Sequence, residues 1–267
     1  MTDYGKIDIL WLDGGWVAKK EEGALNDAYM QKATQAPSGF IKNRIVNQDI
    51  RMDELVDKAR KRQPGLIVVD RAVQGKNQNY LTPENKVPDR ALPYPWESCI
   101  IAGGGWSWVD NPQYKSSREL IRMLVDIVCK GGNLLLNIAP SPDGIWHEDA
   151  YDRLKHIGAW MRVNKEAIYD TRAIAPYKEA KIGYTFKKDS NTLYAIYLPD
   201  ENELSLPPKI LLKSFAPVQG SKVTLLGVDA PLAWTVVHGA THITVPQRIQ
   251  QAPPCRSAWV FKLKVNR

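Results

Sequence analysis

The sequence predicts an α/β region followed by an antiparallel β-sandwich, and two patterns support this prediction. Up to about residue 172, short apolar runs alternate with segments whose apolar residues recur at helical spacing. This order predicts parallel strands joined by crossover helices, in either a doubly wound sheet or part of a (β/α)8 barrel. Beyond that point, apolar residues alternate at every second position, which predicts antiparallel strands. We therefore expect two domains, residues 1–172 and 173–267.

The α/β region is predicted to contain four strands and three helices. The strands are short β-branched or leucine-rich runs, and the helices carry an apolar face. Pro64 and Gly65 should end the first helix, and Gly131 and Gly132 the second. In chain order we expect a strand over 7–12, a helix over 49–62, strands over 66–69 and 98–102, a helix over 116–130, a strand over 133–139 and a helix over 148–168. The connection over 74–95 is longer than two elements need, so we treat it as a candidate functional loop.

The C-terminal region is predicted to be built from strands without helices. Turn residues separate seven segments of alternating polarity, which is typical of a sandwich of roughly ninety residues. These segments are 182–187, 192–198, 209–212, 222–226, 233–237, 242–245 and 258–265. We expect an independent domain that contributes no residue to the functional site.

Composition excludes several classes of protein. The formal net charge is +7, yet the 36 basic residues are interspersed with 29 acidic ones and form no basic block, so we expect no nucleic-acid partner. The three cysteines, Cys99, Cys129 and Cys255, are too few and too far apart for a disulfide framework. No apolar run is long enough to span a membrane, and no signal peptide is visible in the chain.

The aromatic balance favours a sugar ligand. The chain has nine Trp and eleven Tyr but only four Phe. Trp and Tyr combine a flat apolar face with a polar tip, which suits a sugar ring that stacks on one side and forms hydrogen bonds at its edge.

Polar residues gather where the predicted parallel strands end. Asp13 follows the first strand, Asp70 and Arg71 follow the second, Glu97 precedes the third, and Asn137 lies near the end of the fourth. Since active sites of barrels lie at the carboxyl ends of strands, carboxylates there are candidates for catalysis.

Other chemistries have little support in the sequence. The histidines His147, His156, His238 and His242 lack zinc-ligand spacing, and no serine lies in a nucleophile elbow. The Gly103-Gly-Gly105 run lacks the third glycine position and the helix start of a dinucleotide loop. Carboxylate chemistry near aromatic residues remains, and we expect no metal and no organic cofactor.

Seven ordered sequence blocks resemble those of glycoside hydrolase family 29, the α-L-fucosidases. The resemblance covers about residues 6–172, and the sandwich beyond matches only as the expected β-rich tail. The blocks are Trp11-Leu-Asp-Gly-Gly-Trp16, Pro64-Gly-Leu-Ile-Val-Val-Asp-Arg71, Tyr80-Leu-Thr-Pro-Glu84, Pro95-Trp-Glu-Ser-Cys99, Trp106-Ser-Trp108, Tyr114-Lys-Ser-Ser-Arg-Glu-Leu120 and Gly131-Gly-Asn-Leu-Leu-Leu-Asn-Ile138. The resemblance implies a partial (β/α)8-type barrel, its C-terminal half, followed by the β-sandwich.

The resemblance also implies the reaction and its two carboxylates. Retaining fucosidases work by double displacement with two carboxyl groups about 5 Å apart. The family pattern assigns the nucleophile to Asp13 and the acid/base to Glu84, with Glu97 as the alternative acid/base. The substrate would be a fucosylated glycan or another fucoside.

Four further residues resemble the family's sugar-binding positions, and Glu97 joins them if Glu84 is the acid/base. Arg71 resembles the arginine that binds fucose hydroxyls, and Trp11 resembles the tryptophan beside it. Trp106 and Trp108 resemble the aromatic wall against the sugar's methyl group, although the family more often has Tyr at the position of Trp108.

The chain departs from the family pattern at its front. A complete barrel takes roughly 200 residues or more, and only four strand-like segments precede the sandwich. An open half-barrel has unpaired strand edges, which predicts self-association and a weak activity of this chain alone. Two alternatives therefore stay open: a non-catalytic fucose-binding remnant, and another retaining glycosidase of similar plan. The compartment is unknown, although the family implies a periplasmic, secreted or lysosomal-type protein.

Overall fold

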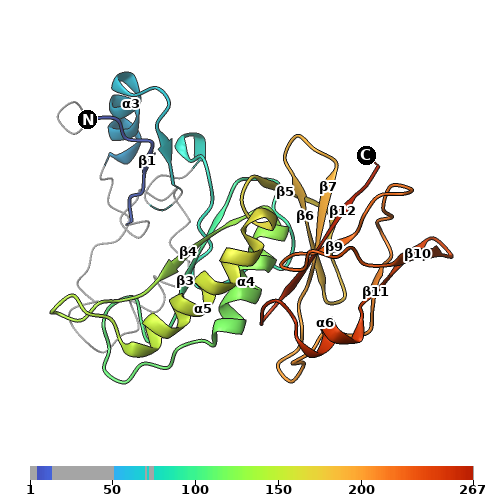
Figure 1. Cartoon of the computed structure of the whole chain (residues 1–267). Coiled ribbons are helices and arrows are strands. Elements are labelled where there is room, and N and C mark those ends of the chain that lie inside the picture. Colours follow the sequence, from blue (N-terminus) through green and yellow to red (C-terminus); the bar gives the residue numbers. More distant parts are fainter. Residues whose placement is uncertain (1–4, 14–50, 70, 72–74, 267) are drawn as a thin grey trace. The chain divides into compact units, whose positions relative to one another are not determined.

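The computed structural model describes residues 5–13, 51–69, 71 and 75–266. The chain divides into two compact units, Met1–Thr82 and Pro83–Arg267, and each is described by itself (Figure 1). Several residues singled out above lie outside the described residues, namely Gly14, Gly15, Trp16, Asp49, Ile50, Asp70 and Gln74. No helix in the described ranges combines the length and the apolar character that a membrane span requires.

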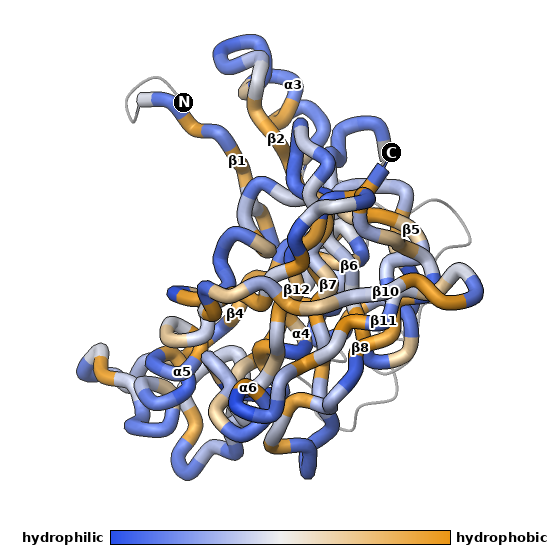
Figure 2. The backbone as a smooth tube through the Cα atoms, turned by 45° about the vertical axis from the view of Figure 1, so that its right-hand side comes forward, coloured by the Kyte–Doolittle hydropathy of each residue, from blue (hydrophilic) through white to orange (hydrophobic). Residues whose placement is uncertain are grey.

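The first unit contains a strand, a helix and a second strand in the predicted order. Its described elements are β1 (Ile9–Leu10), α3 (Met52–Arg62), β2 (Ile67–Val68) and the short 3-10 turn η3 (Gly75–Asn77). β1 and β2 pair in parallel, as expected of strands joined by a crossover helix. In Figure 2, α3 is hydrophilic over most of its length, whereas β2 is hydrophobic. The apolar residues of the helix therefore form a narrow face.

The described residues of this unit form one small apolar cluster. Val56 and Ala59 of α3 pack with Leu66 and Val68, and all four side chains are buried. At about 1.5–3 kcal/mol for each fully buried large apolar side chain, such a cluster stabilises the unit only modestly. Polar contacts must supply part of the remaining stability.

Arg60 of α3 is the centre of a polar network among the described residues of the first unit. Its guanidinium donates hydrogen bonds to Leu66 O at 3.2 Å, to Asn77 Oδ1 and O at 3.1 and 2.9 Å, and to Asn79 Oδ1 at 2.6 Å. The same Asn79 exchanges two hydrogen bonds of 2.8 Å with the backbone of Val68, and Asn77 donates to Asp53. The network therefore fastens residues 77–79 to both α3 and β2.

The second unit begins with another parallel strand pair and its helices. These elements are β3 (Glu97–Ile101), α4 (Ser117–Cys129), β4 (Asn133–Asn137), α5 (Glu148–Asn164) and the 3-10 turn η4 (Lys165–Ala167). β3 and β4 pair in parallel with Glu97 opposite Asn133. Ser116 caps α4, because its Oγ accepts a hydrogen bond from Glu119 N at 3.0 Å. The predicted helix over 148–168 ends earlier, at Asn164.

The rest of this unit is an antiparallel sandwich of two sheets. One sheet has the order β5-β6-β7-β12-β9 and the other the order β10-β11-β8. Their strands are β5 (Thr171–Glu179), β6 (Ile182–Lys187), β7 (Thr192–Tyr197), β8 (Lys209–Leu212), β9 (Thr224–Leu225), β10 (Trp234–Val237), β11 (Ala240–Thr244) and β12 (Trp259–Lys264). Side chains from both sheets form one apolar cluster, which includes Tyr184, Leu212, Ile243 and Phe261.

Helices α4 and α5 cover the other face of the five-stranded sheet. Ile121 and Val125 of α4 and Trp160 of α5 share a second cluster with Tyr194 of β7 and Val260 of β12. Figure 1 shows the two helices between the β3–β4 pair and this sheet. The sandwich and the helices thus share an apolar cluster, and the independence of the sandwich as a domain stays a prediction.

Two expectations about the sandwich need correction. The sandwich is not free of helices, because α6 (Gln247–Gln251) precedes β12. β5 has no counterpart among the predicted strands; Pro176 and a register shift between Ala173 and Lys178 break its alternation. The described parallel strands form two pairs, β1-β2 and β3-β4, and no closed barrel, which agrees with the prediction of a partial one. The boundary between residues 172 and 173 stays a prediction, and it falls inside β5.

Candidate active site

The first group of predicted site residues lies at the carboxyl ends of β1 and β2. Trp11 and Asp13 follow β1, and Arg71 follows β2. The Arg71 Cζ lies 5.3 Å from the centre of the Trp11 ring, in a cation–π arrangement. Arg71 Nε also donates a 2.7 Å hydrogen bond to the Oγ1 of Thr82, which is buried. The structure thus brings Trp11 and Arg71 together.

This group combines a carboxylate with a fixed guanidinium. Parallel pairing of β1 with β2 places both strand ends at the same edge of the sheet. Asp13 is exposed, while Trp11 and Arg71 are half-buried. A guanidinium offers five N–H donors in a planar fork, which suits a ligand carrying several oxygen atoms. Thr82 was missed as a functional residue, although it belongs to the Tyr80–Glu84 block.

Glu84 lies in the second unit on a segment that runs beside β3. Its backbone forms a parallel bridge with Cys99, in which Cys99 N donates to Pro83 O at 3.1 Å and Asn85 N donates to Cys99 O at 2.7 Å. Asn85 Oδ1 accepts a 3.3 Å hydrogen bond from Ile101 N. The backbone of Glu84 is therefore fixed, while its side chain is exposed.

Glu97 occupies a different place on the same strand. It is the first residue of β3 and pairs with Asn133, the first residue of β4. At about 3.3 Å per residue, it lies roughly 13 Å from the carboxyl end of the strand. Glu97 therefore lies at the end of β3 opposite to Trp106 and Asn137.

The loop that follows β3 carries both predicted wall tryptophans, and its base is closed by backbone contacts. Gly103 pairs with Tyr114, and Lys115 N donates to Ala102 O at 2.9 Å. A Cβ on Gly103 would come within 2.5 Å of the Tyr114 ring, so only glycine fits there. Gly104 has a positive φ of 72°. The Gly103-Gly-Gly105 run thus shapes this loop.

Trp106 and Trp108 lie in this loop in different environments. Trp106 is 43% exposed, and its carbonyl and that of Gly105 accept hydrogen bonds from Asn137 Nδ2 at 3.4 and 3.3 Å. Trp108 is half-buried, and its Nε1 donates to Asp110 Oδ1 at 3.3 Å. An exposed indole and a fixed one therefore lie in the loop at the carboxyl end of β3.

His147 is a functional candidate that sequence reasoning missed. Its imidazole stacks on Trp108 with ring centres 3.7 Å apart and an interplanar angle of 2°, and its Nδ1 lies 3.4 Å from the Tyr114 hydroxyl. Burial, together with the charge of Asp149, raises the pKa of Tyr114, which keeps the hydroxyl protonated. No local sequence pattern predicts a stack between residues of two separate loops, and zinc-ligand spacing, the pattern expected of a functional histidine, is absent around His147.

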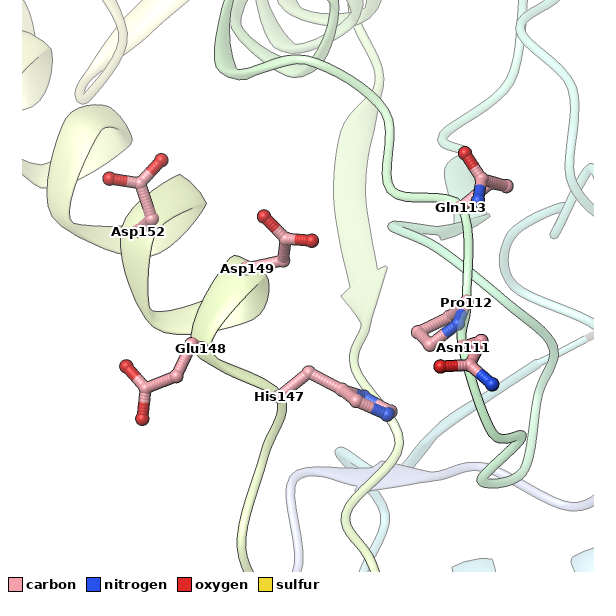
Figure 3. A pocket seen from close by; sticks show the side chains of 7 residues that line it. All are labelled: Asn111, Pro112, Gln113, His147, Glu148, Asp149 and Asp152. Atoms are coloured by element: carbon pink, nitrogen blue, oxygen red, sulfur yellow. The ribbon is translucent and has the colours of Figure 1, made fainter.

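A hollow of about 640 Å³ adjoins this group at the start of α5. Figure 3 shows its lining: Asn111, Pro112 and Gln113 on the loop, and His147, Glu148, Asp149 and Asp152 at the helix. The side chain of His147 extends from the helix toward Asn111 and Pro112. Within the described ranges, no group of His, Cys, Asp and Glu side chains is arranged to hold a metal ion.

Comparison with known proteins identifies the family. A family model described as alpha-L-fucosidase matches residues 1–166, and one described as the alpha-L-fucosidase C-terminal domain matches residues 177–264. The plasma alpha-L-fucosidase of Homo sapiens is 33% identical over 187 residues, which cover 66% of this chain and 39% of the relative. The tissue alpha-L-fucosidase of Rattus norvegicus is 28% identical over 278 residues, covering 98% and 53%.

Solved structures share the fold. Alpha-L-fucosidase isoenzyme 1 from Paenibacillus thiaminolyticus superposes with a TM-score of 0.72 at 24% identity, over all of this chain and 59% of that one. The Thermotoga maritima alpha-fucosidase gives a TM-score of 0.65 at 24% identity, over 80% and 48%. The chain belongs to the α-L-fucosidase family. It spans about half the length of the curated relatives it matches.

Proposed function

We propose that the protein hydrolyses α-L-fucosidic linkages with retention of anomeric configuration. The observation that carries this proposal is the group of Trp11, Asp13 and Arg71 at the carboxyl ends of two parallel strands, in a chain of this family. A carboxylate beside a fixed guanidinium and an indole provides both a nucleophile and a sugar-binding surface. The substrate is a fucosylated glycan or a simpler fucoside.

Asp13 is proposed as the nucleophile. Its ionised carboxylate attacks the anomeric carbon, the bond to the leaving oxygen breaks, and a glycosyl-enzyme ester forms. Arg71 binds sugar hydroxyls, and its hydrogen bond to Thr82 and its contact with Trp11 keep the guanidinium in one orientation. Rigid support of this kind lowers the ordering cost of binding.

Glu84 is proposed as the acid/base. It protonates the leaving oxygen in the first step and removes a proton from water in the second. The position of Glu97 at the amino end of β3 favours Glu84, because barrel chemistry takes place at the carboxyl ends. An exposed side chain on a fixed backbone suits a group that must reach a bound substrate.

Trp106 and Trp108 are proposed as the aromatic wall of the sugar site. The exposed indole of Trp106 offers an apolar face to the methyl group of fucose, and the loop contacts described above hold it in place. Double displacement needs two carboxyl groups and water, so the proposal includes no metal or organic cofactor.

The architecture proposed for this function is a partial (β/α)8-type barrel over residues 1–172, followed by a sandwich domain over 173–267. Parallel pairing supports it in each unit: β1 with β2 and Val69 with Tyr80 in the first, β3 with β4 and Glu84 with Cys99 in the second. A (β/α)8 barrel pairs all of its strands in parallel.

The test is turnover of an aryl α-L-fucoside by the full natural chain, with the anomer of the first product followed by NMR. Retention supports the proposal, and inversion contradicts it. Glu84→Ala should lose activity that azide restores on an activated substrate, because azide replaces the water that needs the base. If azide restores the activity of Glu97→Ala and not that of Glu84→Ala, Glu97 is the acid/base. Binding of fucose without any turnover would favour the non-catalytic alternative.

A further inference from the structure

The stack between Trp108 and His147 joins two separate parts of the second unit. Trp108 lies in the loop after β3, and His147 precedes α5 in the connection after β4. The two rings are parallel within 2° at a centre-to-centre distance of 3.7 Å. Such a stack fixes the plane of the indole as well as its position.

Tyr114 completes the arrangement from the far end of the same loop. Its ring meets His147 edge-on with centres 6.0 Å apart, and its hydroxyl lies 3.4 Å from His147 Nδ1. Because Tyr114 itself packs directly on Gly103, it is anchored to the end of β3. His147 is therefore held by an anchored residue on its edge and by Trp108 on its face.

The contacts at the base of the loop do not fix Trp108 by themselves. The backbone bonds that close the loop involve Ala102, Gly104, Gln113 and Lys115. Trp108 lies in the middle of the loop, where its side chain contacts Asp110 and His147. Figure 3 shows His147 reaching from the start of α5 toward this loop.

We infer that His147 is a positioning residue that holds Trp108 in one orientation and covers one face of its indole. A sugar that contacts Trp108 must then use the opposite face or the edge. The restriction on the sugar rests on the proposed function, whereas the positioning of Trp108 by His147 rests on the geometry alone. His147 acts through Trp108, so its loss should weaken substrate binding more than it slows the chemistry.

The variants separate the stack from other roles of the side chain. His147→Ala and His147→Gln remove the stack, His147→Phe keeps an aromatic ring, and Tyr114→Phe removes only the hydroxyl. The His147 side chain makes no capping hydrogen bond, so its replacement should leave the start of α5 intact. His156→Ala is the matched control, because His156 is exposed on α5 and contacts Asp152.

The first measurement is ¹⁹F NMR of the full natural chain labelled with 5-fluorotryptophan, with the Trp108 signal assigned by its absence in Trp108→Phe. His147→Ala and His147→Gln should shift and broaden this signal, whereas His147→Phe should keep it sharp and His156→Ala should leave it unchanged. An unchanged, sharp Trp108 signal in both His147→Ala and His147→Gln would overturn the inference.

The second measurement is the kinetics of the same variants on an aryl α-L-fucoside. His147→Ala should raise KM by about twofold to tenfold, the size expected for one aromatic pair, and change kcat little. His147→Phe should restore KM. A loss of kcat at constant KM would overturn the positioning role. If neither the natural chain nor any variant turns over the fucoside, the proposed function fails. The NMR measurement still decides whether His147 positions Trp108.

Discussion

The two compact units are stabilised by different means. In the described part of the first, a cluster of four buried side chains is supplemented by the polar network around Arg60. In the second, two extensive apolar clusters enclose the five-stranded sheet from both sides. The candidate residues show the same contrast within each unit: Asp13 and Arg71 of the first unit are charged, whereas Trp108, Tyr114 and His147 of the second form a group of aromatic rings.

This difference predicts where local unfolding should need the least free energy. Regions with little buried apolar area open at lower free energy than a large core does, and binding sites are often drawn from such regions. Among the described residues, the proposed nucleophile therefore lies in the unit with the smaller apolar cluster and a network of directional hydrogen bonds. The scaffold of the aromatic group depends on packing.

The largest effect should come from Trp160→Ala, which removes the side chain shared by α5 and the sandwich. Trp160 is buried and donates a 2.9 Å hydrogen bond to Ala258 O, so its loss should cost about 3–5 kcal/mol of unfolding free energy. Hydrogen exchange should speed up in both α5 and β12. The exposed Tyr151, replaced by Ala, is the control. Unchanged exchange protection of the β12 amides would support the prediction that the sandwich is an independent domain.

Arg60→Met should have the next largest effect and should act on the first unit. It deletes the hydrogen bonds to Leu66, Asn77 and Asn79 while keeping an apolar stem, at a cost of about 2–3 kcal/mol. Exchange should accelerate over residues 66–79. Arg62→Met, which replaces an exposed residue of the same helix, is the control and should leave the exchange rates unchanged. Equal effects of the two variants would mean that the network contributes little.

Arg71→Lys sharpens the comparison at the level of the site. Lysine keeps the charge but lacks the planar fork that lies over Trp11 and donates to Thr82, so kcat/KM on an aryl fucoside should fall about tenfold. Thr82→Val, which removes only the acceptor, should produce a smaller loss. Full activity of Arg71→Lys would show that charge alone suffices.

The smallest effect is a pH dependence confined to the sandwich. Burial raises the pKa of Glu179, but hydrogen bonds from Ser214, Tyr184 and the Lys213 backbone outweigh it, so the pKa lies below the usual 4.5. Because the folded pKa is depressed, this stabilisation is present above about pH 4.5 and is lost as pH falls through the folded value. Urea unfolding at pH 7 and 3.5 should show a smaller decrease for Glu179→Gln than for the natural chain. An identical decrease in both proteins would show that the Glu179 carboxyl does not contribute to the pH dependence.

Sequence patterns predicted most elements because their signals are local. β6 and β8 occur over the predicted residues, since alternation and flanking turn residues mark both ends. β5 was missed because Pro176 interrupts its pattern. The helix-covered face of the sheet was also missed, because β7 is buried on both faces and no longer alternates.

The candidate site was predictable only in part. The strand ends pointed to Asp13 and Arg71, and the family blocks added Glu84 and both wall tryptophans. His147 depends on a contact between two loops that only the fold brings together, and spacing along the chain carries no record of it. The amino-end position of Glu97, by contrast, was already predicted, because Glu97 precedes the strand expected over 98–102, and the structure makes it the first residue of β3.

The role of Asp13 is the central claim, and trapping its covalent intermediate tests it most directly. The full natural chain would be treated with 2-deoxy-2-fluoro-α-L-fucosyl fluoride, whose fluorine at carbon 2 slows hydrolysis of the glycosyl-enzyme ester, and then digested and analysed by mass spectrometry. We expect a fluorofucosyl adduct on the peptide containing Asp13, absent from Asp13→Ala and present in the control Asp8→Ala. An adduct on another carboxylate, or turnover of fucosides by Asp13→Ala at the natural rate, would contradict the account.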